Sequence, residues 1–544
     1  MKLKRAWLAV PAVLALSLGA CSSGGGDKDQ SGTDEKDNAV SSEGTSGGVV
    51  TANGTEPQNP LIPADTNEVG GGRIVDLLFA GLLYYDKDGQ VHNDMAESIE
   101  TEDSQTYTVT LKEGQTFSDG SPVTASSFVD AWKKAAAEDA LNINFFEPIE
   151  GADDYGAGDL TGLKVIDDTQ FTITLKRQEA DFPLRLGYSA FYPLPQSTLD
   201  DKEAGGENPI GNGPYMLAGD GAWVHNEKID LVPNPSYQGD RKAKNAGVTF
   251  VFYTEATAAY NDLLGDSLDV LDQIPDDAIT VFQDDLGDRA INQPAAVVQT
   301  FTIPERLANF DGEEGNLRRQ AISHAIDRAE ITKTIFNDTR TPAQDFTSPV
   351  VTGYAEGLPG SEVLKFDPEK AKELWAQAEE IAPFEGTFEI AYNGDGPHEA
   401  WVTAVTNQLT NNLGIDAQPK AFPDFKSFRD AITNREITTA FRTGWQADYP
   451  SAFNFLSPLY FTGAGSNDGD YSNPAFDAAL TEAAAATSVD ESNKKLDEAQ
   501  TILFEDLPAI PLWYQNGFGG YSTHVQNVEF GWNSVPLYYE ITKD

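Results

Sequence analysis

The 544-residue chain contains one cysteine, three methionines and five histidines. A single cysteine excludes an internal disulfide and a cysteine metal site, so the folded part must be stabilised by its core. The five histidines are scattered, and no His-Glu-x-x-His motif accompanies them. Carboxylates are too abundant for any catalytic pair to stand out. We therefore predict no enzyme, no catalytic residue, no cofactor and no metal site, and keep an exported hydrolase only as an alternative.

Basic residues are also scarce. Lys and Arg number 37 against 86 Asp and Glu, which gives a formal net charge of −49. Such a surface repels phosphate backbones, so nucleic-acid binding is excluded. The apolar fraction of 40% and the aromatic fraction of 10% are typical of globular proteins. The length is sufficient for two or three domains.

Long apolar runs are absent apart from residues 6–18, which follow Lys2, Lys4 and Arg5. This run is shorter than the roughly 20 residues that span a bilayer. A basic head, a short apolar middle and the sequence Leu-Gly-Ala-Cys are typical of a secretory signal. We predict a signal peptide at 1–20 and lipidation of Cys21. The protein should then be extracytoplasmic and anchored to a bacterial cell membrane.

The segment after the predicted anchor has almost no apolar residues. Residues 21–47 consist mainly of Gly, Ser, Asp, Lys and Glu. They cannot bury a core and are expected to form a flexible stalk. The β-branched residues at 49–51 indicate the first strand.

Alternating apolar residues predict strands at 106–111 and 171–175. Helical spacing follows at 123–137, with Thr124 as a plausible N-cap. A further strand is expected at 248–253. The first half of the folded chain is therefore rich in strands.

The second half is richer in helices. Residues 317–336 are expected to form one helix, a second begins at Asp367-Pro368, and a third is expected at 399–413. Interleaved strands indicate an α/β lobe, and residues 528–541 look strand-like again. This order predicts two lobes with crossed connections and a cleft between them.

Seven segments resemble, in order, the peptide and nickel class (family 5) of extracellular solute-binding proteins of ABC importers. The most recognisable is Phe-Ser-Asp-Gly-Ser-Pro-Val-Thr-Ala at 117–125, and the last is Gly-Trp-Gln-Ala-Asp-Tyr-Pro at 444–450. The others lie at 56–60, 78–89, 107–114, 208–215 and 321–328. The nearest pattern is that of oligopeptide-binding lipoproteins.

The resemblance implies an α/β fold of the periplasmic-binding-protein type II kind, with two lobes, a cleft and an extra β-rich subdomain. The lobes of that fold close over the ligand by hinge motion. By position, lobe I is expected at 48–80, 200–299 and 507–544, its inserted subdomain at 81–199, and lobe II at 300–506.

The function implied is capture of short peptides and their delivery to the permease and ATPase of an ABC importer by a monomeric lipoprotein. The same scaffold also binds nickel chelates, haem, opines or oligosaccharides, so a non-peptide solute stays open.

The resemblance assigns the ends of a bound peptide to particular residues. Asp448 matches the aspartate that pairs with the peptide's α-ammonium, and Arg442 matches an arginine that contacts the carboxylate end. His398 has the spacing of a histidine used for longer peptides. Phe336 stands where those binders carry a lysine, so the preferred length is left open. Each charged residue could equally be an ordinary surface group.

Two further segments are expected to pair with the peptide through their backbones. One contains Gly444, Trp445 and Gln446, although Trp445 is also a candidate core aromatic. The other, from the opposite lobe, contains Asn67, Glu68 and Val69. Backbone pairing of this kind gives affinity without selecting side chains.

Overall fold

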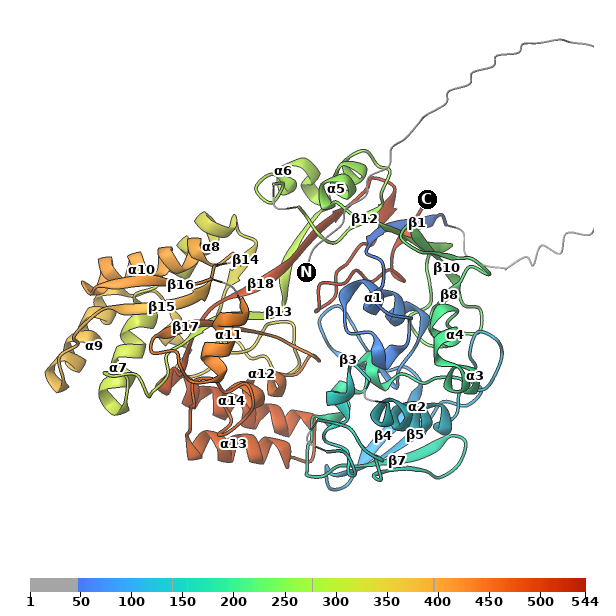
Figure 1. Cartoon of the computed structure of the whole chain (residues 1–544), viewed down its shortest axis with the longest axis horizontal. Helices are drawn as coiled ribbons and strands as arrows, with labels where there is room; N and C mark the ends of the chain where they lie inside the picture. Colours follow the sequence, from blue (N-terminus) through green and yellow to red (C-terminus); the bar gives the residue numbers. More distant parts are fainter. Residues whose placement is uncertain (1–46, 139, 154, 276, 395–396, 424) are drawn as a thin grey trace, which may run out of the picture. The chain divides into compact units, whose positions relative to one another are not determined.

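The computed structural model (Figure 1) describes residues 47–544 apart from 139, 154, 276, 395–396 and 424. The predicted signal peptide, Cys21 and nearly all of the predicted stalk lie outside the described residues. Among the helices of the described part, none combines the length and apolarity needed to cross a membrane.

A 12-stranded mixed sheet connects the two halves of the described chain. Its two 13-residue strands, β13 and β18, pair antiparallel and stand between β17 on one side and β12 on the other. Figure 1 shows these two strands running from the region of β15–β17 to the region of β1. The order is β16-β15-β17-β13-β18-β12-β1-β11-β10-β8, with β14 paired to β18 and β9 paired to β10.

The strands of this sheet come from distant parts of the sequence. They are β1 (Val49–Gly54), β8 (Tyr215–Leu217), β9 (Trp223–Val224), β10 (Lys228–Pro233), β11 (Gly247–Phe252), β12 (Val270–Leu271), β13 (Ala290–Thr302), β14 (Arg340–Pro342), β15 (Phe388–Asn393), β16 (Ala417–Phe422), β17 (Ala440–Gln446) and β18 (Ala509–Tyr521).

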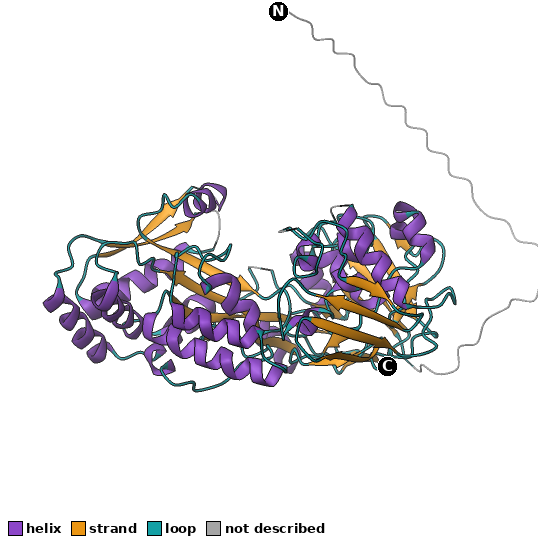
Figure 2. Ribbon diagram, turned by 90° about the horizontal axis from the view of Figure 1, so that it is seen from below, coloured by secondary structure: helices purple, strands orange, loops and turns teal. Residues whose placement is uncertain are grey.

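Buried apolar residues form two large cores. One combines residues from 50–270 with residues from 449 and 525–541, and the other combines residues from 301–513. Figure 2 shows that helices and strands occur together in both parts of the described chain. Burial of apolar area of this kind is the main favourable term in folding. The expected lobe boundaries stay a prediction.

A four-stranded antiparallel sheet lies within residues 96–174, and helix α2 packs against it. The predicted strands at 106–111 and 171–175 are confirmed as β5 and β7. Thr124 is the N-cap of α2 and forms a capping box with Ser127, as expected for a helix start. The strands outside the main sheet are β2 (Leu83–Tyr85), β3 (Val91–Asn93), β4 (Ala96–Thr101), β5 (Thr106–Leu111), β6 (Leu163–Val165), β7 (Gln170–Thr174), β19 (Val525–Gln526) and β20 (Thr542–Lys543).

The α-helices before residue 300 are shorter on average than those after it. They are α1 (Val69–Leu78), α2 (Ala125–Ala137), α3 (Gln196–Asp200), α4 (Lys202–Glu207), α5 (Ala256–Leu264) and α6 (Phe282–Leu286). The later helices are α7 (Gly312–His324), α8 (Arg328–Phe336), α9 (Pro368–Ile381), α10 (Glu399–Leu413), α11 (Phe425–Thr433), α12 (Ala452–Tyr460), α13 (Pro474–Ala484) and α14 (Val489–Asp506). The 3-10 helices are η1 (Pro63–Asp65), η2 (Ile143–Phe146), η3 (Phe182–Arg185), η4 (Ser189–Phe191), η5 (Gly287–Arg289) and η6 (Ser361–Leu364).

Two local predictions are wrong. Residues 317–336 form two helices instead of one, because the carboxylate of Asp327 accepts the N–H of Glu330 and starts α8. Residues 528–541 form no continuous strand; they contain one isolated bridge, Phe530 to Pro536. Pro536 has no N–H, so it interrupts any ladder there.

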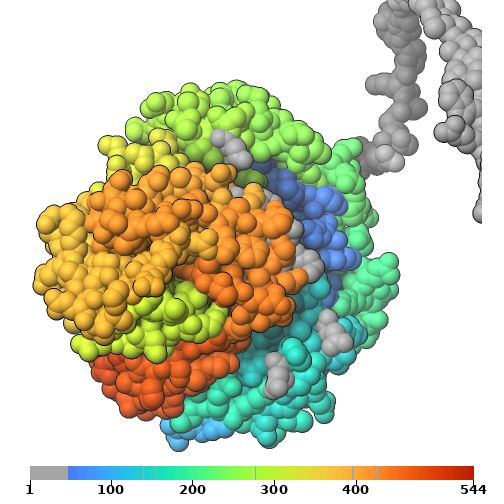
Figure 3. All heavy atoms as spheres, turned by 60° about the vertical axis from the view of Figure 1, so that its left-hand side comes forward, coloured from blue at the N-terminus to red at the C-terminus, as the bar shows by residue number. Residues whose placement is uncertain are grey.

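The segment at 104 and 179–185 contacts the segments at 449–451 and 484–486. Ala180 N–H donates to the Ala484 carbonyl at 2.8 Å. In Figure 3 orange-red atoms from the C-terminal part of the chain lie beside cyan atoms from the N-terminal part at the lower surface. This contact includes Tyr449, the residue that follows Asp448 in the sequence.

Candidate functional site

One edge of β17 is open. Strand β17 pairs antiparallel with β13 from Phe441 to Gln446, whereas on its other edge β15 pairs only with Ala440 and Phe441. No other described strand continues that outer edge. An open strand edge presents backbone donors and acceptors to which an extended chain can add.

Residues 442–448 border four cavities in succession. Arg442 to Trp445 line a cavity of about 340 Å³, which we call the Arg442 cavity. Gln446 and Ala447 line one of about 390 Å³, the tyrosine cavity, and one of about 370 Å³. Asp448 lines the tyrosine cavity and also one of about 690 Å³. A ligand lying along this stretch therefore has space beside it.

The structure brings one predicted backbone segment and the end of the other to one cavity, whereas Gly444 and Trp445 line the Arg442 cavity. Asn67, Glu68 and Val69 line the tyrosine cavity together with Gln446 and Asp448. The Val69 side chain is 62% exposed. Glu68 is the N-cap of α1, and its Oε1 accepts the Gly71 N–H at 2.8 Å. Its carboxylate thus has a structural role already.

Asp448 is exposed at the cavity surface and is held by Asn454 of α12. The Asn454 Nδ2 donates to Asp448 Oδ2 at 3.2 Å, and Asn454 Oδ1 accepts the Asp448 N–H at 3.0 Å. The same oxygen accepts Trp445 Nε1–H at 3.1 Å. Desolvation by the surrounding protein atoms raises the pKa of Asp448, and the hydrogen bond from Asn454 and the charge of Arg185 oppose this rise. The carboxylate is fixed in position yet faces open space.

Arg442 lies at the other end of the stretch. Its Nε and Nη2 both donate to Asn393 Oδ1, at 2.9 and 2.6 Å, and its guanidinium lies 5.2 Å from the centre of the Phe428 ring. Amide and ring hold a planar guanidinium in one orientation. Gly444, two residues on, is exposed, and a Cβ there would lie 2.9 Å from the Val298 carbonyl. Glycine at 444 thus allows β13 and β17 to approach closely.

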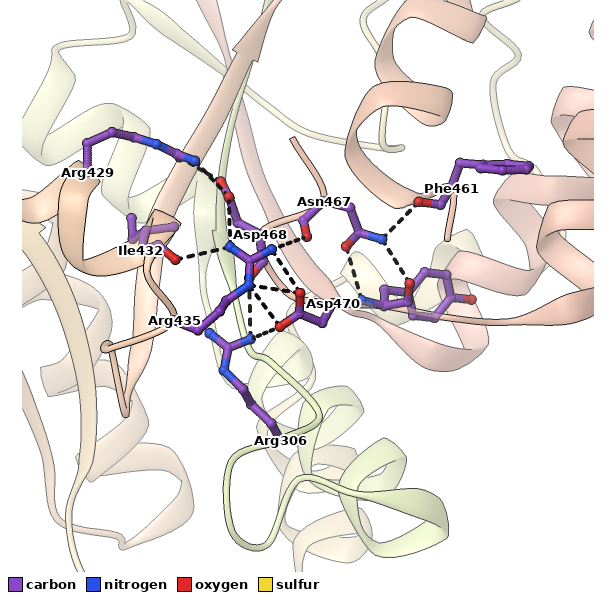
Figure 4. Close-up of polar contacts among 9 residues, drawn as sticks. Arg306, Arg429, Ile432, Arg435, Phe461, Asn467, Asp468 and Asp470 are labelled. Atoms are coloured by element: carbon purple, nitrogen blue, oxygen red, sulfur yellow. Dashed lines mark hydrogen bonds and ion pairs between the residues drawn. The ribbon is translucent and has the colours of Figure 1, made fainter. Parts of the chain in front are cut away.

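The second arginine of the Arg442 cavity has a carboxylate partner. Arg429 donates to both oxygens of Asp468, at 2.6 and 2.7 Å. Figure 4 shows this pair beside Arg306 and Arg435, which both bind Asp470. This cluster is therefore internally neutralised to a large extent and holds the loop at 466–471 in place.

His398 and Phe336 are not brought to these cavities. His398 is the N-cap residue of α10, and its Nδ1 lies 3.2 Å from Trp401 Nε1. Phe336 packs on Trp513, with ring centres 5.0 Å apart, and carries the guanidinium of Arg340 at 5.2 Å. Burial lowers the pKa of Arg340 to about 10. The role of His398 in binding stays a prediction.

A buried polar contact adjoins Asp448. Tyr449 and Ser451 donate to Oδ2 of Asp181, at 3.3 and 3.2 Å, and Arg185 Nη2 donates to the Tyr449 hydroxyl at 3.2 Å. Burial raises the pKa of Asp181 to about 6. This contact ties the loop that carries Asp448 to the segment around η3.

Four residues with clear positions at the site have no signal in the sequence. They are Asn454, Asp76, Tyr188 and Asn393. Only their proximity in space to Asp448 or Arg442 distinguishes them, and no local motif marks them. Within the described residues, no group of three His, Cys, Asp or Glu side chains is placed to hold a metal ion.

Two α/β cores joined by long strands, with cavities along an open strand edge, define a two-lobed binding protein. The model of the bacterial extracellular solute-binding proteins, family 5, matches residues 90–467, so the chain belongs to that family. The resemblance stated from the sequence, and with it the type II fold, is confirmed.

Individual relatives support the same family. The chain is 28% identical over 483 residues to the periplasmic oligopeptide-binding protein OppA of Salmonella typhimurium, covering 86% of this chain and 87% of the relative. It is 29% identical over 495 residues to the dipeptide-binding protein of Lactococcus lactis, covering 85% and 88%. The unliganded open form of the murein tripeptide-binding protein MppA matches with a TM-score of 0.82 at 23% identity, covering 91% and 97%.

Proposed function

We propose that this protein captures short peptides between residues 67–69 and 442–448 and delivers them to the permease of an ABC importer. One observation carries the proposal: an open strand edge has a carboxylate, Asp448, at one end and a guanidinium, Arg442, at the other. A free peptide in extended conformation has the complementary charges at its ends.

The charges also give the peptide a direction. Its amino end lies at Asp448 and its carboxyl end at Arg442, so the peptide runs antiparallel to β17. Six residue steps separate the two, or about 20 Å at roughly 3.3 Å per residue. The two side chains occupy part of this span, which leaves room for a peptide of about three to five residues.

Asp448 supplies the partner that an ammonium needs when it leaves water. Burying an unpaired cation costs several kcal/mol, and a fixed carboxylate offsets that cost. A bound ammonium also favours the ionised form of Asp448, whose pKa is raised in the free protein. The carboxylate thus offsets the cost of burying the ammonium, and the ammonium stabilises the ionised carboxylate.

Backbone pairing sets the breadth of the specificity. The outer edge of β17 binds the main chain of the peptide, and the side chains enter the cavities on either side. Waters in such cavities bridge polar groups at little cost, so many side chains are tolerated.

The proposal includes the location of the protein. A lipid on Cys21, joined to the folded part by residues 22–47, holds a monomeric receptor near its permease and ATPase. The family is extracellular by description. Replacement of Cys21 by Ser should leave peptide binding in vitro unchanged, remove label incorporation from radioactive palmitate and reduce import in cells.

Titration calorimetry on residues 48–544 tests the binding itself. Ala-Ala-Ala to Ala-Ala-Ala-Ala-Ala, each with free ends, should bind, and N-acetylated, C-amidated copies of equal length should bind far more weakly. Mass spectrometry of the protein released from cells identifies any ligand that it carries. If no peptide binds while a nickel chelate, haem, an opine or an oligosaccharide does, the peptide proposal is wrong.

A further inference from the structure

The tyrosine cavity has an excess of negative charge. Its charged lining residues are four carboxylates and two guanidiniums: Glu68, Asp76, Asp86, Asp448, Arg73 and Arg241. The proposed function, on which this inference rests, already assigns Asp448 to the peptide's ammonium. The remaining charges decide what else the cavity accepts.

Both guanidiniums are neutralised by carboxylates that do not line this cavity. Arg73 Nη1 lies 2.7 Å from Asp272 Oδ2, and both side chains are nearly inaccessible. Arg241 donates to Asp94 Oδ2 through Nε and Nη2, at 3.0 and 2.9 Å, where Asp94 is fully buried. Within each pair the opposite charges cancel, so the lining carboxylates dominate the electrostatic potential in the cavity.

Asp76 lies on the face of α1 that lines the cavity. Val69, Gly72, Arg73 and Asp76 recur at helical spacing along that face. The Asp76 side chain is half-buried, and its Oδ1 accepts the Tyr192 hydroxyl at 3.1 Å. Burial raises the pKa of Asp76 to about 6, and the charge of Arg241 and the Tyr192 hydrogen bond oppose this rise, so the carboxylate is ionised above neutral pH. It is a second anionic point, separate from Asp448.

Tyr188 lies near both anionic points. Burial raises the pKa of its phenol, and the charges of Asp448 and Asp76 raise it further. Six other aromatic residues line the same cavity: Tyr84, Tyr85, Tyr192, Trp532, Tyr538 and Tyr539. Aromatic faces attract cations, with estimates of about 0.5–2 kcal/mol each according to exposure.

We propose that the tyrosine cavity binds a cationic side chain and that the protein prefers peptides with a lysine or arginine at or next to the amino end. Asp448 takes the α-ammonium, Asp76 faces the side-chain cation across the Tyr188 ring, and the aromatic residues surround the alkyl stem. A glutamate in the same place meets more carboxylates than guanidiniums, and both guanidiniums are already paired, so it is disfavoured.

A matched peptide series tests this preference. We expect Lys-Ala-Ala to bind about tenfold more tightly at pH 7.5 than norleucine-Ala-Ala, which keeps the stem and lacks the charge. Glu-Ala-Ala should bind more weakly than both. Ala-Lys-Ala covers the neighbouring position. If the norleucine and lysine peptides bind equally at both positions, the inference is overturned.

Two variants assign the effect to Asp76. Asp76→Asn retains an acceptor for Tyr192 and should reduce the lysine-to-norleucine ratio to near one, without loss of norleucine-Ala-Ala binding. Asp130→Asn removes the same charge from the exposed face of α2 and should leave the ratio unchanged. A preference that survives Asp76→Asn shows that Asp76 is not the counter-charge. Failure of every peptide, including Ala-Ala-Ala, overturns the proposed function instead.

Discussion

The two ends of the 442–448 stretch differ in charge and in how they are held. At the Asp448 end, carboxylates and tyrosines surround a cavity of about 390 Å³, and an amide, Asn454, orients the exposed carboxylate. At the Arg442 end, the Thr443 hydroxyl hydrogen-bonds to the hydroxyls of Thr300 and Thr302, and Asn393 and Phe428 orient the guanidinium. An open strand edge alone has no preferred direction for a ligand. In the proposed binding mode, the opposite charges at its ends supply one.

Removing the Asp448 charge should have the largest effect. We expect Asp448→Ala to weaken binding of free-amine Ala-Ala-Ala by about 100-fold, because a desolvated ammonium loses its only assigned partner. Binding of the N-acetylated peptide should change little, and Asp130→Asn should change neither. Calorimetry measures both peptides. Equal losses for both would remove Asp448 from the amino-terminal role.

Arg442 should matter less, since its side chain is half-buried and the hydroxyl-bearing residues Thr300, Thr302 and Thr443 line the same cavity. We expect Arg442→Ala to weaken binding of Ala-Ala-Ala by about tenfold and to leave the C-terminal amide of the same peptide unaffected. Arg306→Gln, in the neighbouring cluster, is the matched control. A loss that is identical for acid and amide would indicate damage to β17 instead of a lost carboxylate contact.

A substitution at Asn454 changes the pKa of Asp448 while the carboxylate itself is retained. The hydrogen bond from Asn454 opposes the rise in the pKa of Asp448, so Asn454→Ala should raise that pKa further. Free-amine peptide binding should then be lost at a higher pH during acidification than in the parent protein. Ser457→Ala, on the same helix, should leave the profile in place. A uniform loss of affinity at all pH values would mean that Asn454 acts only through the backbone.

The smallest effect concerns the contact that supports the Asp448 end. Asp181 has a pKa of about 6 in the folded protein against 3.8 as the ordinary value, so the folded state binds the extra proton between these pH values. The stability that Asp181 contributes is complete below about pH 4 and is lost as the pH rises through 6. Asp181→Asn should flatten the fall in unfolding free energy over this range by about 1–2 kcal/mol, as urea titrations at pH 4.5 and 7 would measure. An unchanged slope would show that Asp76 and Asp345, whose pKa values are also about 6, account for it.

Local features of the fold were predictable from local patterns. The cap at Thr124, the start of α9 at Asp367 and the end of α10 at Gly414 each depend on a few adjacent residues. The single helix expected at 317–336 failed because apolar spacing continues through residues 325–327, although the backbone turns there and Asp327 starts a new helix. Periodicity does not detect a short break of this kind.

The candidate site was predictable only along two short stretches of chain. The family resemblance pointed to 442–448 and 67–69, and residues 67–69 and 446–448 line the tyrosine cavity. Asp76, Tyr188 and Asn454 have no motif of their own, since their significance depends on which residues lie opposite them.

The sequence by itself determined the family and several helices and strands, and it suggested the residues at the two ends of the stretch, because motifs and caps depend on neighbouring residues. Only the tertiary structure decided that α1, η4, β17 and the segment at 531–539 enclose one cavity. It also decided which arginines are neutralised and which carboxylates are left to face a ligand. Such pairings join residues well over a hundred positions apart, which only the folded chain brings together.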